Sequence, residues 1–420
     1  MTVSPPTTPY PVAPQYFVVG REPSPAVEAT VFAGVKSGVF QPQNMVNPLK
    51  DNSYWGDMAE LHNMQQGPRW AKHTIPESPL YADTIGHFLY GLFGDYTAVG
   101  TASTPTWTVG ASPLTAGATS ITVTTGSVAA SGTFIQVDTG VNAEIVTVGT
   151  GSTSTNIVLN ANTPLRFSHL ASVAVVTVVA PFTHTFALLN TGGTGLYAPS
   201  AQPPTYTIGH INTPAGSGNY YADQFLYAIM DELTISAKAD GWLTWSAKMT
   251  SRSQLVPGGT MSGTISPITA NPSWRSTVTR ASSLVNTIAA WSGTWTRKND
   301  TDPTADGTQD PYFFGRGQLN GAWKMTISPA VDESEITTFL LPNSQPALTW
   351  ATSNGGSGAS LNSITINSQL TGYEGSNLTA QRQFWGYESS GSFVSSSTGA
   401  GNSGGTTPSQ VVLVNAIPSY

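Results

Sequence analysis

Two segments of alternating apolar and polar residues, joined by Asp240-Gly241, constrain the fold of this chain more than any other feature. Their apolar positions are Leu233, Ile235, Ala237 and Ala239 in the first segment, and Leu243, Trp245, Ala247 and Met249 in the second. A period of two is that of a strand with one buried face, and Asp-Gly is a frequent hairpin turn. The sequence therefore predicts an antiparallel hairpin with one face against a core.

Further short strands bounded by turn residues follow this hairpin. They are predicted at residues 290–296, 322–328, 347–352, 363–367, 383–387 and 410–415. Several such strands at short spacing are typical of a mainly β fold.

Two segments favour short helices instead. In residues 81–93 the apolar positions recur at i, i+3, i+4, i+7 and i+8, which is one face of a helix. Pro79 and Asp83 suit its first turn and Gly94 suits its end. Residues 332–341 begin with acidic residues and predict a second, shorter helix.

Residues 104–180 differ in composition from the rest of the chain. Their charged side chains are Asp138, Glu144 and Arg166. Short strands separated by Gly, Ser and Thr turns are predicted at residues 120–124, 133–137, 143–148, 156–159 and 172–179. We interpret this segment as a small all-β sandwich or barrel inserted into a loop of a larger domain, because surface loops tolerate insertions.

The order of sequence signals occurs twice. Trp70 to Pro76, the helix near 81–93, the Pro181 strand, a glycine loop at 190–195 and Leu233-Thr-Ile form the first set. The second set is Trp323 to Pro329, the helix near 332–341, the Pro346 strand, a glycine loop at 354–358 and Ile364-Thr-Ile. Either the chain carries two copies of one β-rich unit, or Thr- and Gly-rich strands resemble each other by chance.

Composition excludes several classes of protein. Charged residues make up 9% of the chain and the net charge is −7. The basic residues are scattered and do not form the basic patch that binds nucleic acid. The absence of Cys excludes disulfides, thiol catalysis and Cys-ligated zinc. No apolar run reaches the length of a membrane span, and the Pro-rich first 19 residues do not have the pattern of a signal peptide.

Residues 1–25 contain seven prolines, which forbid a helix and favour an extended path. In an assembly such an arm lies on a neighbouring subunit, whereas in a solitary domain it stays loose.

The ionisable residues do not form a catalytic pattern. The candidates are the histidines His62, His73, His87, His169, His184 and His210, the acidic groups Asp231-Glu232 and Asp332-Glu333-Ser334-Glu335, and the aspartates Asp300, Asp302, Asp306 and Asp310. The histidines lack metal-site spacing, and the acidic groups begin a strand and a helix. The aspartates resemble a calcium loop only faintly, because no Glu closes the loop and Pro303 interrupts it.

Other motifs do not indicate a catalytic or binding site either. Gly356-Ser357-Gly358 belongs to a glycine loop rather than to a nucleophile elbow. Tryptophans could form a sugar-binding platform, but Trp245 aligns with core positions, and Trp242, Trp291 and Trp295 suit an interface equally well. We predict no catalytic, cofactor-binding or metal-binding residues, no cofactor and no enzyme activity.

Four segments in a fixed order resemble a known family. They are YADTIGHFLYGLFG (81–94), PFTHTF (181–186), PPTYTIGHI (203–211) and DELTISAKADGWLTWSAKM (231–249). The arrangement is similar to that of the tail tube proteins (major tail proteins) of long-tailed bacteriophages. SGTWTR, DESEITTFL and QVVLVNAI also look like that family's second half. The resemblance covers most of the chain outside residues 104–180.

The resemblance implies a mechanical role. Tail tube proteins pair strands edge to edge into rings, and the rings stack into a hollow conduit in the virion. The lumen holds the tape-measure protein during assembly in the host cytoplasm and later passes genomic DNA, and the tube contacts tail terminator and distal tail proteins. An acidic chain suits such a conduit, because a basic lining would grip DNA.

If the repeat is real, the resemblance implies a mainly β chain with two similar tail-tube-type β-sandwich or β-barrel domains, short helices and an inserted small all-β domain. The expected parts are an arm (1–25), a discontinuous first tube domain (26–103 and 181–255), the insert (104–180) and a second tube domain (256–420). Three copies would then close a ring with pseudo-sixfold symmetry, and a homohexamer is the alternative.

Two other classes of function stay open at this point. One is an extracellular or virion carbohydrate-binding adhesin, in which aromatic residues form platforms on a β-sandwich. The other is a polysaccharide-degrading enzyme, for which Asp231 and Glu232 are the best carboxylates.

Overall fold

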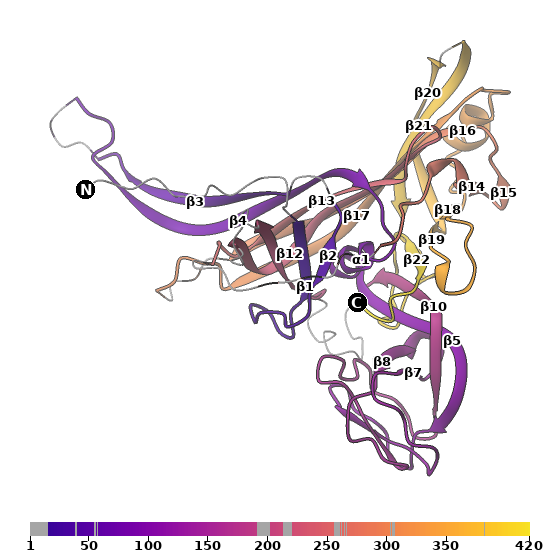
Figure 1. Ribbon diagram of the computed structural model, residues 1–420. Coiled ribbons are helices and arrows are strands. Elements are labelled where there is room, and N and C mark those ends of the chain that lie inside the picture. The colour runs from indigo at the N-terminus through magenta and orange to yellow at the C-terminus, as the bar shows by residue number, and fades with distance from the viewer. Residues whose placement is uncertain are drawn as a thin grey trace.

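The computed structural model describes residues 16–37, 40–53, 56, 58–190, 202–212, 221–255, 261, 263, 265, 267–302, 304, 307–381 and 383–420. As predicted, the chain is mainly β, with several antiparallel sheets, none of which is closed within these residues. Figure 1 shows a long hairpin projecting from the sheets on the left and a separate lobe below them.

The larger sheet of the described residues has eleven strands. Eight lie side by side in the order β3 (Gln41–Asp51), β4 (Asn63–Pro79), β13 (Thr244–Ser251), β12 (Tyr221–Lys238), β16 (Ile288–Asp302), β17 (Phe313–Ile327), β21 (Phe384–Val394) and β20 (Leu370–Gln381). The other three continue from the first part of β12: β11 (Tyr206–Asn212), β1 (Tyr16–Arg21) and β2 (Ala33–Val35).

The second sheet has nine strands within the described part of the chain. Its order is β15 (Ser283–Leu284), β14 (Thr277–Arg280), β18 (Leu348–Ser353), β19 (Ser363–Ser368), β22 (Gln410–Asn415), β10 (Ala174–Leu188), β7 (Phe134–Val137) and β8 (Glu144–Thr147), and β5 (Gly94–Thr108) pairs with β10. Among the described residues, three short 3-10 helices lie outside the sheets: η1 (Gly140–Asn142), η3 (Ser273–Arg275) and η5 (Gly358–Ser360).

The same order of elements occurs twice along the chain. A hairpin (β3–β4), a helix, two strands of the second sheet (β5 and β10) and a hairpin (β12–β13) are followed by β16–β17, a helix, β18–β19 and β20–β21. In the larger sheet the first four-strand unit, β3-β4-β13-β12, lies beside the second, β16-β17-β21-β20, in matching order. By this order β18 corresponds to β5 and β19 corresponds to β10. The sequence match of the Pro181 and Pro346 strands, β10 and β18, is therefore wrong, and so is the match of the Leu233 and Ile364 strands, β12 and β19.

The two units share one core. Alternate side chains of the larger sheet, such as Leu233, Ile235, Trp295 and Trp323, point to the same buried cluster as Ile366 and Leu413 of the second sheet. The predicted hairpin 233–249 is therefore confirmed as β12–β13, with its apolar face inside. The division into two tube domains stays a prediction, because no separate core marks a boundary at residue 256.

The first helix, α1 (Ile85–Phe93), lies between the sheets. Gly94 ends it in the left-handed conformation, as predicted, and its N–H bonds the carbonyl of Tyr90. The helix begins four residues later than predicted, so Asp83 precedes its first turn. Nearly every residue of α1 is buried, which explains why its sequence is apolar beyond a single face.

The second predicted helix is shorter and of a different type. η4 (Glu335–Leu340) is a π-helix, and Asp332 precedes it. Glu335 does not offset a helix dipole in solvent. Its carboxylate is buried in an ion pair with Arg280, and it accepts a hydrogen bond from Ser389 Oγ.

Of the expected extended arm at residues 1–25, residues 1–15 lie outside the described residues. Residues 16–21 are extended as predicted, but they form a strand of the larger sheet and not an arm. β1 is a buried strand between β2 and β11, with Phe17, Val18 and Val19 nearly inaccessible. The strands β3, β4, β5 and β20 were not predicted, because many of their residues are polar and long parts of them are exposed.

The inserted segment has its own core, as its composition suggests. Ile121, Val137, Val148, Ile157 and Leu165 belong to a cluster distinct from the main one. A two-stranded sheet, β6 (Ser120–Thr122) with β9 (Asn156–Val158), closes one side. The long strands β5 and β10 run from the main body into this lobe, which lies at the bottom of Figure 1.

Candidate assembly surfaces

The histidines occupy structural positions. Burial lowers the pKa of His73 and His87 to about 3 and that of His184 to about 4, so these rings are neutral. His210 Nδ1 lies 3.6 Å from Asp223 Oδ2, and His62 precedes β4. Among the described residues no group of three or more ionisable side chains is placed to hold a metal ion.

The acidic candidates are also dispersed. Asp231 accepts hydrogen bonds from Thr250 and Asn299, and burial raises its pKa, while Glu232 pairs with Lys248 at 3.1 Å. Asp310 binds Ser253 and Arg69. Asp300 and Asp302 are exposed on β16, and Asp306 and Pro303 lie outside the described residues.

The polar face of the larger sheet is lined with hydroxyls and with charges of both signs. Thr234, Ser236, Ser246, Ser292 and Ser390 border one shallow groove on it. Five of the seven lysines of the chain lie on this face: Lys72, Lys238, Lys248, Lys298 and Lys324. Glu77, Glu232 and Glu388 lie among them. Asp231 and Asp300 border a second groove on it, so this face carries charges of both signs.

The row of eight strands from β3 to β20 ends in two open edges. In the described residues β20 pairs only with β21, and β3 pairs only with β4. An open edge presents unpaired N–H and C=O groups to any strand that approaches it. Pro42 and Pro48 lie on β3, a position that suits proline because an edge strand needs fewer donors.

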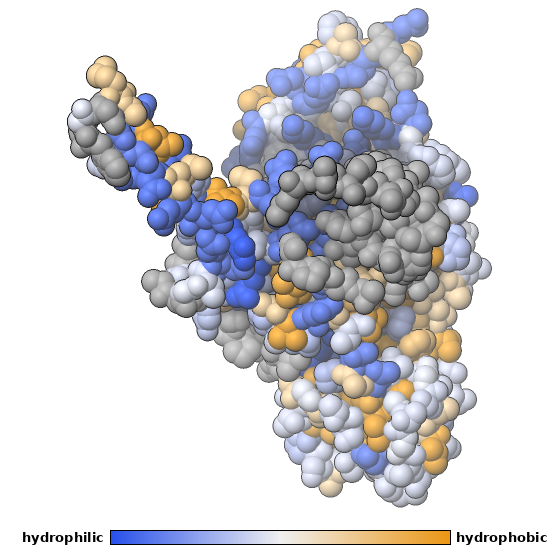
Figure 2. All heavy atoms as spheres, turned by 60° about the vertical axis from the view of Figure 1, so that its left-hand side comes forward, coloured by the Kyte–Doolittle hydropathy of each residue, from blue (hydrophilic) through white to orange (hydrophobic). Residues whose placement is uncertain are grey.

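The outer part of the β3–β4 hairpin projects away from the body as a two-stranded ribbon (Figure 1). We name the described residues of this ribbon, 45–53, 56 and 58–68, the arm, which is distinct from the expected N-terminal arm. Its exposed apolar side chains are Met45, Val46, Leu49, Met58, Leu61 and Met64. Figure 2 shows these hydrophobic residues among hydrophilic ones along the arm at the upper left. A lone hairpin is marginally stable in water, and exposed apolar side chains of this kind mark a contact surface.

Large aromatic residues are exposed at the opposite end of the same sheet. Trp242 lies in the β12–β13 turn and Trp274 in η3 beside it, while Phe384 and Trp385 begin β21. Phe384 and Trp385 are each 61% exposed. Trp245, Trp291 and Trp295 are buried in the core, so they cannot form a sugar-binding platform.

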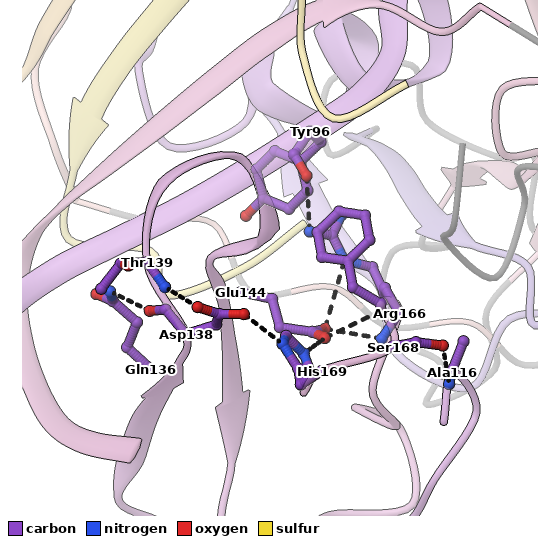
Figure 3. Close-up of polar contacts among 10 residues, drawn as sticks. Tyr96, Ala116, Gln136, Asp138, Thr139, Glu144, Arg166, Ser168 and His169 are labelled. Carbon is purple, nitrogen blue, oxygen red and sulfur yellow. Dashed lines mark hydrogen bonds and ion pairs between the residues drawn. The ribbon is translucent and has the colours of Figure 1, made fainter. Parts of the chain in front are cut away.

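The charged residues of the inserted lobe gather where it meets the body (Figure 3). Glu144 is buried and accepts hydrogen bonds from the backbone N–H groups of Arg166 (2.8 Å) and Phe167 (3.0 Å). His169 lies between two carboxylates, with Nε2 2.8 Å from Glu144 and Nδ1 3.3 Å from Asp138. Burial disfavours the imidazolium, but these carboxylates outweigh burial and raise the pKa of His169.

Arg166 connects this cluster to the body. Its Nη2 donates to the carbonyl of Tyr96 (2.7 Å), its Nη1 donates to Tyr90 Oη (3.4 Å), and the guanidinium covers the Tyr96 ring at 4.3 Å. The charged side chains of the lobe thus form hydrogen bonds and ion pairs where the lobe meets the body. The rest of its surface is mostly pale in Figure 2, the colour of intermediate hydropathy. Its aromatic residues Trp107, Phe134 and Phe167 are buried or half-buried.

No family model and no curated protein matches this chain. Within the described residues no helix is long and apolar enough to cross a membrane.

Proposed function

We propose that this protein is a structural subunit that assembles into rings and stacked tubes, as the tail tube proteins of long-tailed phages do. The observation that supports it most is the four-strand unit used twice in one sheet. β12 of the first unit already pairs with β16 of the second, and β16 corresponds to β3. The free edge of β20 can therefore receive β3 of another copy in the same way.

Three copies would supply six such units and close the row of strands at β20 and β3, which removes the hazard of these two open edges. The polar face of the sheet, rich in Ser, Thr and Lys, would then line a water-filled lumen. The lumen would hold the tape-measure protein and pass the genome without reading its sequence. We propose a homotrimeric ring with pseudo-sixfold symmetry, against the alternative of six copies.

The two ends of the sheet differ in a manner that suits stacking. The apolar arm projects from one end, and the exposed aromatic residues Trp242, Trp274, Phe384 and Trp385 lie at the other. Contact between unlike ends adds rings in one direction and builds an open stack. The subunit would reside in the tail tube of the virion and meet terminator and distal proteins at the tube ends, with no enzyme activity.

A carbohydrate-binding adhesin is the second candidate, because the four exposed aromatic residues could stack on sugars. The inserted lobe does not favour it, since the described part of the lobe exposes no aromatic side chain among its large apolar residues. Saturable binding of host cell-wall material by a chain that stays monomeric would support the adhesin instead of the tube.

The test is the mass and shape of the purified chain. Light scattering and negative-stain imaging should give trimers of the 44.0 kDa chain, with a central hole, or tubes built from them. Leu49→Ser with Met64→Ser should shorten the tubes while rings persist, because both side chains lie exposed on the arm. Val128→Ser on the inserted lobe is the matched exposed control and should leave tube length unchanged. A permanent monomer at high concentration contradicts the proposal.

Truncation of the first residues must respect β1. Removal of residues 1–15 should weaken stacking more than ring closure. Removal of residues 1–25 would also delete a buried strand and so would not separate the two effects.

A further inference from the structure

The pairing of β12 with β16 provides a template for contact between copies. We call this pairing the internal seam. It is antiparallel and places Ser236 opposite Ser292 and Thr234 opposite Thr294. The hydroxyls of Thr234 and Thr294 lie 3.0 Å apart across it on the polar face.

The hairpins on one side of each seam can be matched residue by residue. In the first unit Gln43 lies opposite Lys72 and Gln41 opposite Thr74. In the second unit Ser292 lies opposite Lys324, and Ala290 lies opposite Thr326. The buried positions between these pairs agree as well: Ala71, His73 and Ile75 correspond to Trp323, Met325 and Ile327. Gln43 therefore corresponds to Ser292, and Met45, two residues on, corresponds to Thr294.

The hairpins on the other side can be matched in the same way. Lys248 lies opposite both Thr74 and Glu232. Glu388 lies opposite both Thr326 and Asn377. Asn377 of β20 therefore corresponds to Glu232 of β12. It follows that Thr379 corresponds to Thr234, and Gln381 corresponds to Ser236.

We propose that β20 of one copy pairs antiparallel with β3 of the next in the register of the internal seam, with Thr379 opposite Met45 and Gln381 opposite Gln43. This register rests on the proposed ring and identifies the partner of both free edges as a second copy of this chain. Both positions lie on the polar face, so their side chains would meet as Thr234 and Thr294 do.

The prolines of β3 fit this register. Pro42 would fall just past Gln381, the last residue of β20, so the donor that it lacks lies beyond the end of that strand. Pro48 follows the irregularity between Val46 and Pro48 in the β3–β4 ladder and would close the other end of the paired stretch. The two prolines therefore confine pairing to residues 43–47 of β3 and prevent a slipped, longer contact.

The internal seam also has the stagger that a closed sheet needs. In the first unit Thr74 lies opposite Lys248, which in turn lies opposite Glu232 of β12. In the second unit the corresponding residue, Thr326, lies opposite Ala290, which lies opposite Lys238 of β12. Corresponding positions of the two units therefore meet β12 six residues apart (238 − 232). Barrel closure requires such a displacement, and repeating it at each β20–β3 contact would keep all six units equivalent.

The experiment uses the absence of cysteine in the chain. Met45→Cys with Thr379→Cys should, in assembled protein under mild oxidation, give dimer and trimer bands on a non-reducing gel. Mixing the two single variants should give dimers only. Thr234→Cys with Thr294→Cys is the matched control at the internal seam and should form an intrachain disulfide. Directly opposite residues meet the distance that a disulfide needs, and residues two positions away do not.

The shifted pairs, Met45→Cys with Asn377→Cys and Met45→Cys with Gln381→Cys, separate the outcomes. Stronger cross-linking of a shifted pair in intact rings overturns the register and leaves the tube proposal standing. Rings without any cross-link at these positions overturn edge pairing between β20 and β3. Chains that never assemble, and so give no intermolecular band, overturn both proposals.

Discussion

α1 and η4 hold the same place in the two repeats of the chain, but their surroundings differ. Every residue of α1 is buried except His87, which is partly buried, whereas Glu335 is the buried residue of η4. The outer side of α1 is covered by the rings of Tyr420 and Tyr206, which lie against Gly86 and Gly91. Beyond η4, Leu341 is 72% exposed.

The difference shows how one topology can be stabilised in two ways. α1 is surrounded by apolar side chains, so its stability comes from burial of apolar surface. η4 has less cover and is held by Arg280, which pairs with Glu335, covers the Phe339 ring at 3.8 Å and donates to Tyr373 Oη at 2.9 Å. The first helix depends on packing, and the second depends on the largely buried guanidinium of Arg280.

The histidines are also distributed unequally between the two halves of the chain. All six lie at or before residue 210, so residues 256–420 have none. Acid should therefore affect the first half of the chain more directly than the second.

Arg280→Ala should have the largest effect. It leaves Glu335 buried without its cation, and breaking a buried ion pair costs about 3–5 kcal/mol. We expect a fall of that size in the free energy of unfolding, with faster amide hydrogen exchange at η4 than at α1. Arg275→Ala, at an exposed site, is the control. Equal loss of protection at both helices would contradict the difference between them.

Lowering the pH from 7 to 5 should have the second-largest effect, a loss of stability in the first half of the chain. Burial lowers the folded-state pKa of His73 and His87 to about 3, below their ordinary value of 6.5. Their contribution is present above pH 6.5 and is lost as pH falls toward the folded-state value. At pH 5 the loss of each histidine's contribution lowers the free energy of unfolding by about 2 kcal/mol.

Hydrogen exchange at both pH values, corrected for the intrinsic rate, should locate this loss at α1 and β4. His87→Gln should reduce the pH dependence at α1. A loss concentrated at η4 would be inconsistent with the assignment.

Gly86→Ala should have an intermediate effect. A Cβ at this position would lie 2.2 Å from the Tyr420 ring, so the ring or the helix must shift, at about 1–3 kcal/mol. Thr338→Ala in η4 is the matched control, because that position is exposed. Chemical denaturation should show a loss for the first variant and little change for the second. An increase in stability for Gly86→Ala would mean that α1 is less tightly covered.

Leu341→Ser should have the smallest effect, within about 0.5 kcal/mol, because the side chain is largely exposed in the single chain. The same denaturation measurement checks it. A loss above about 1 kcal/mol would show that η4 is covered and would weaken the contrast with α1.

Local sequence patterns determined a large part of this fold. Alternation and Asp240-Gly241 were sufficient for β12–β13, and the period of apolar residues with Gly94 was sufficient for α1. The low charge of residues 104–180 marked a lobe with its own core. These signals are read from neighbouring residues, so they do not depend on distant partners.

Tertiary structure alone decided which distant strands meet. β3 and β20 have no clear alternation because their faces and edges are exposed, so they were missed, and they form the candidate assembly edges. The lysines lie far apart in sequence and share a face only because the register of five strands aligns them. The matching of the two units follows from strand order, which hydrogen bonds between segments up to hundreds of residues apart determine and which no local pattern contains.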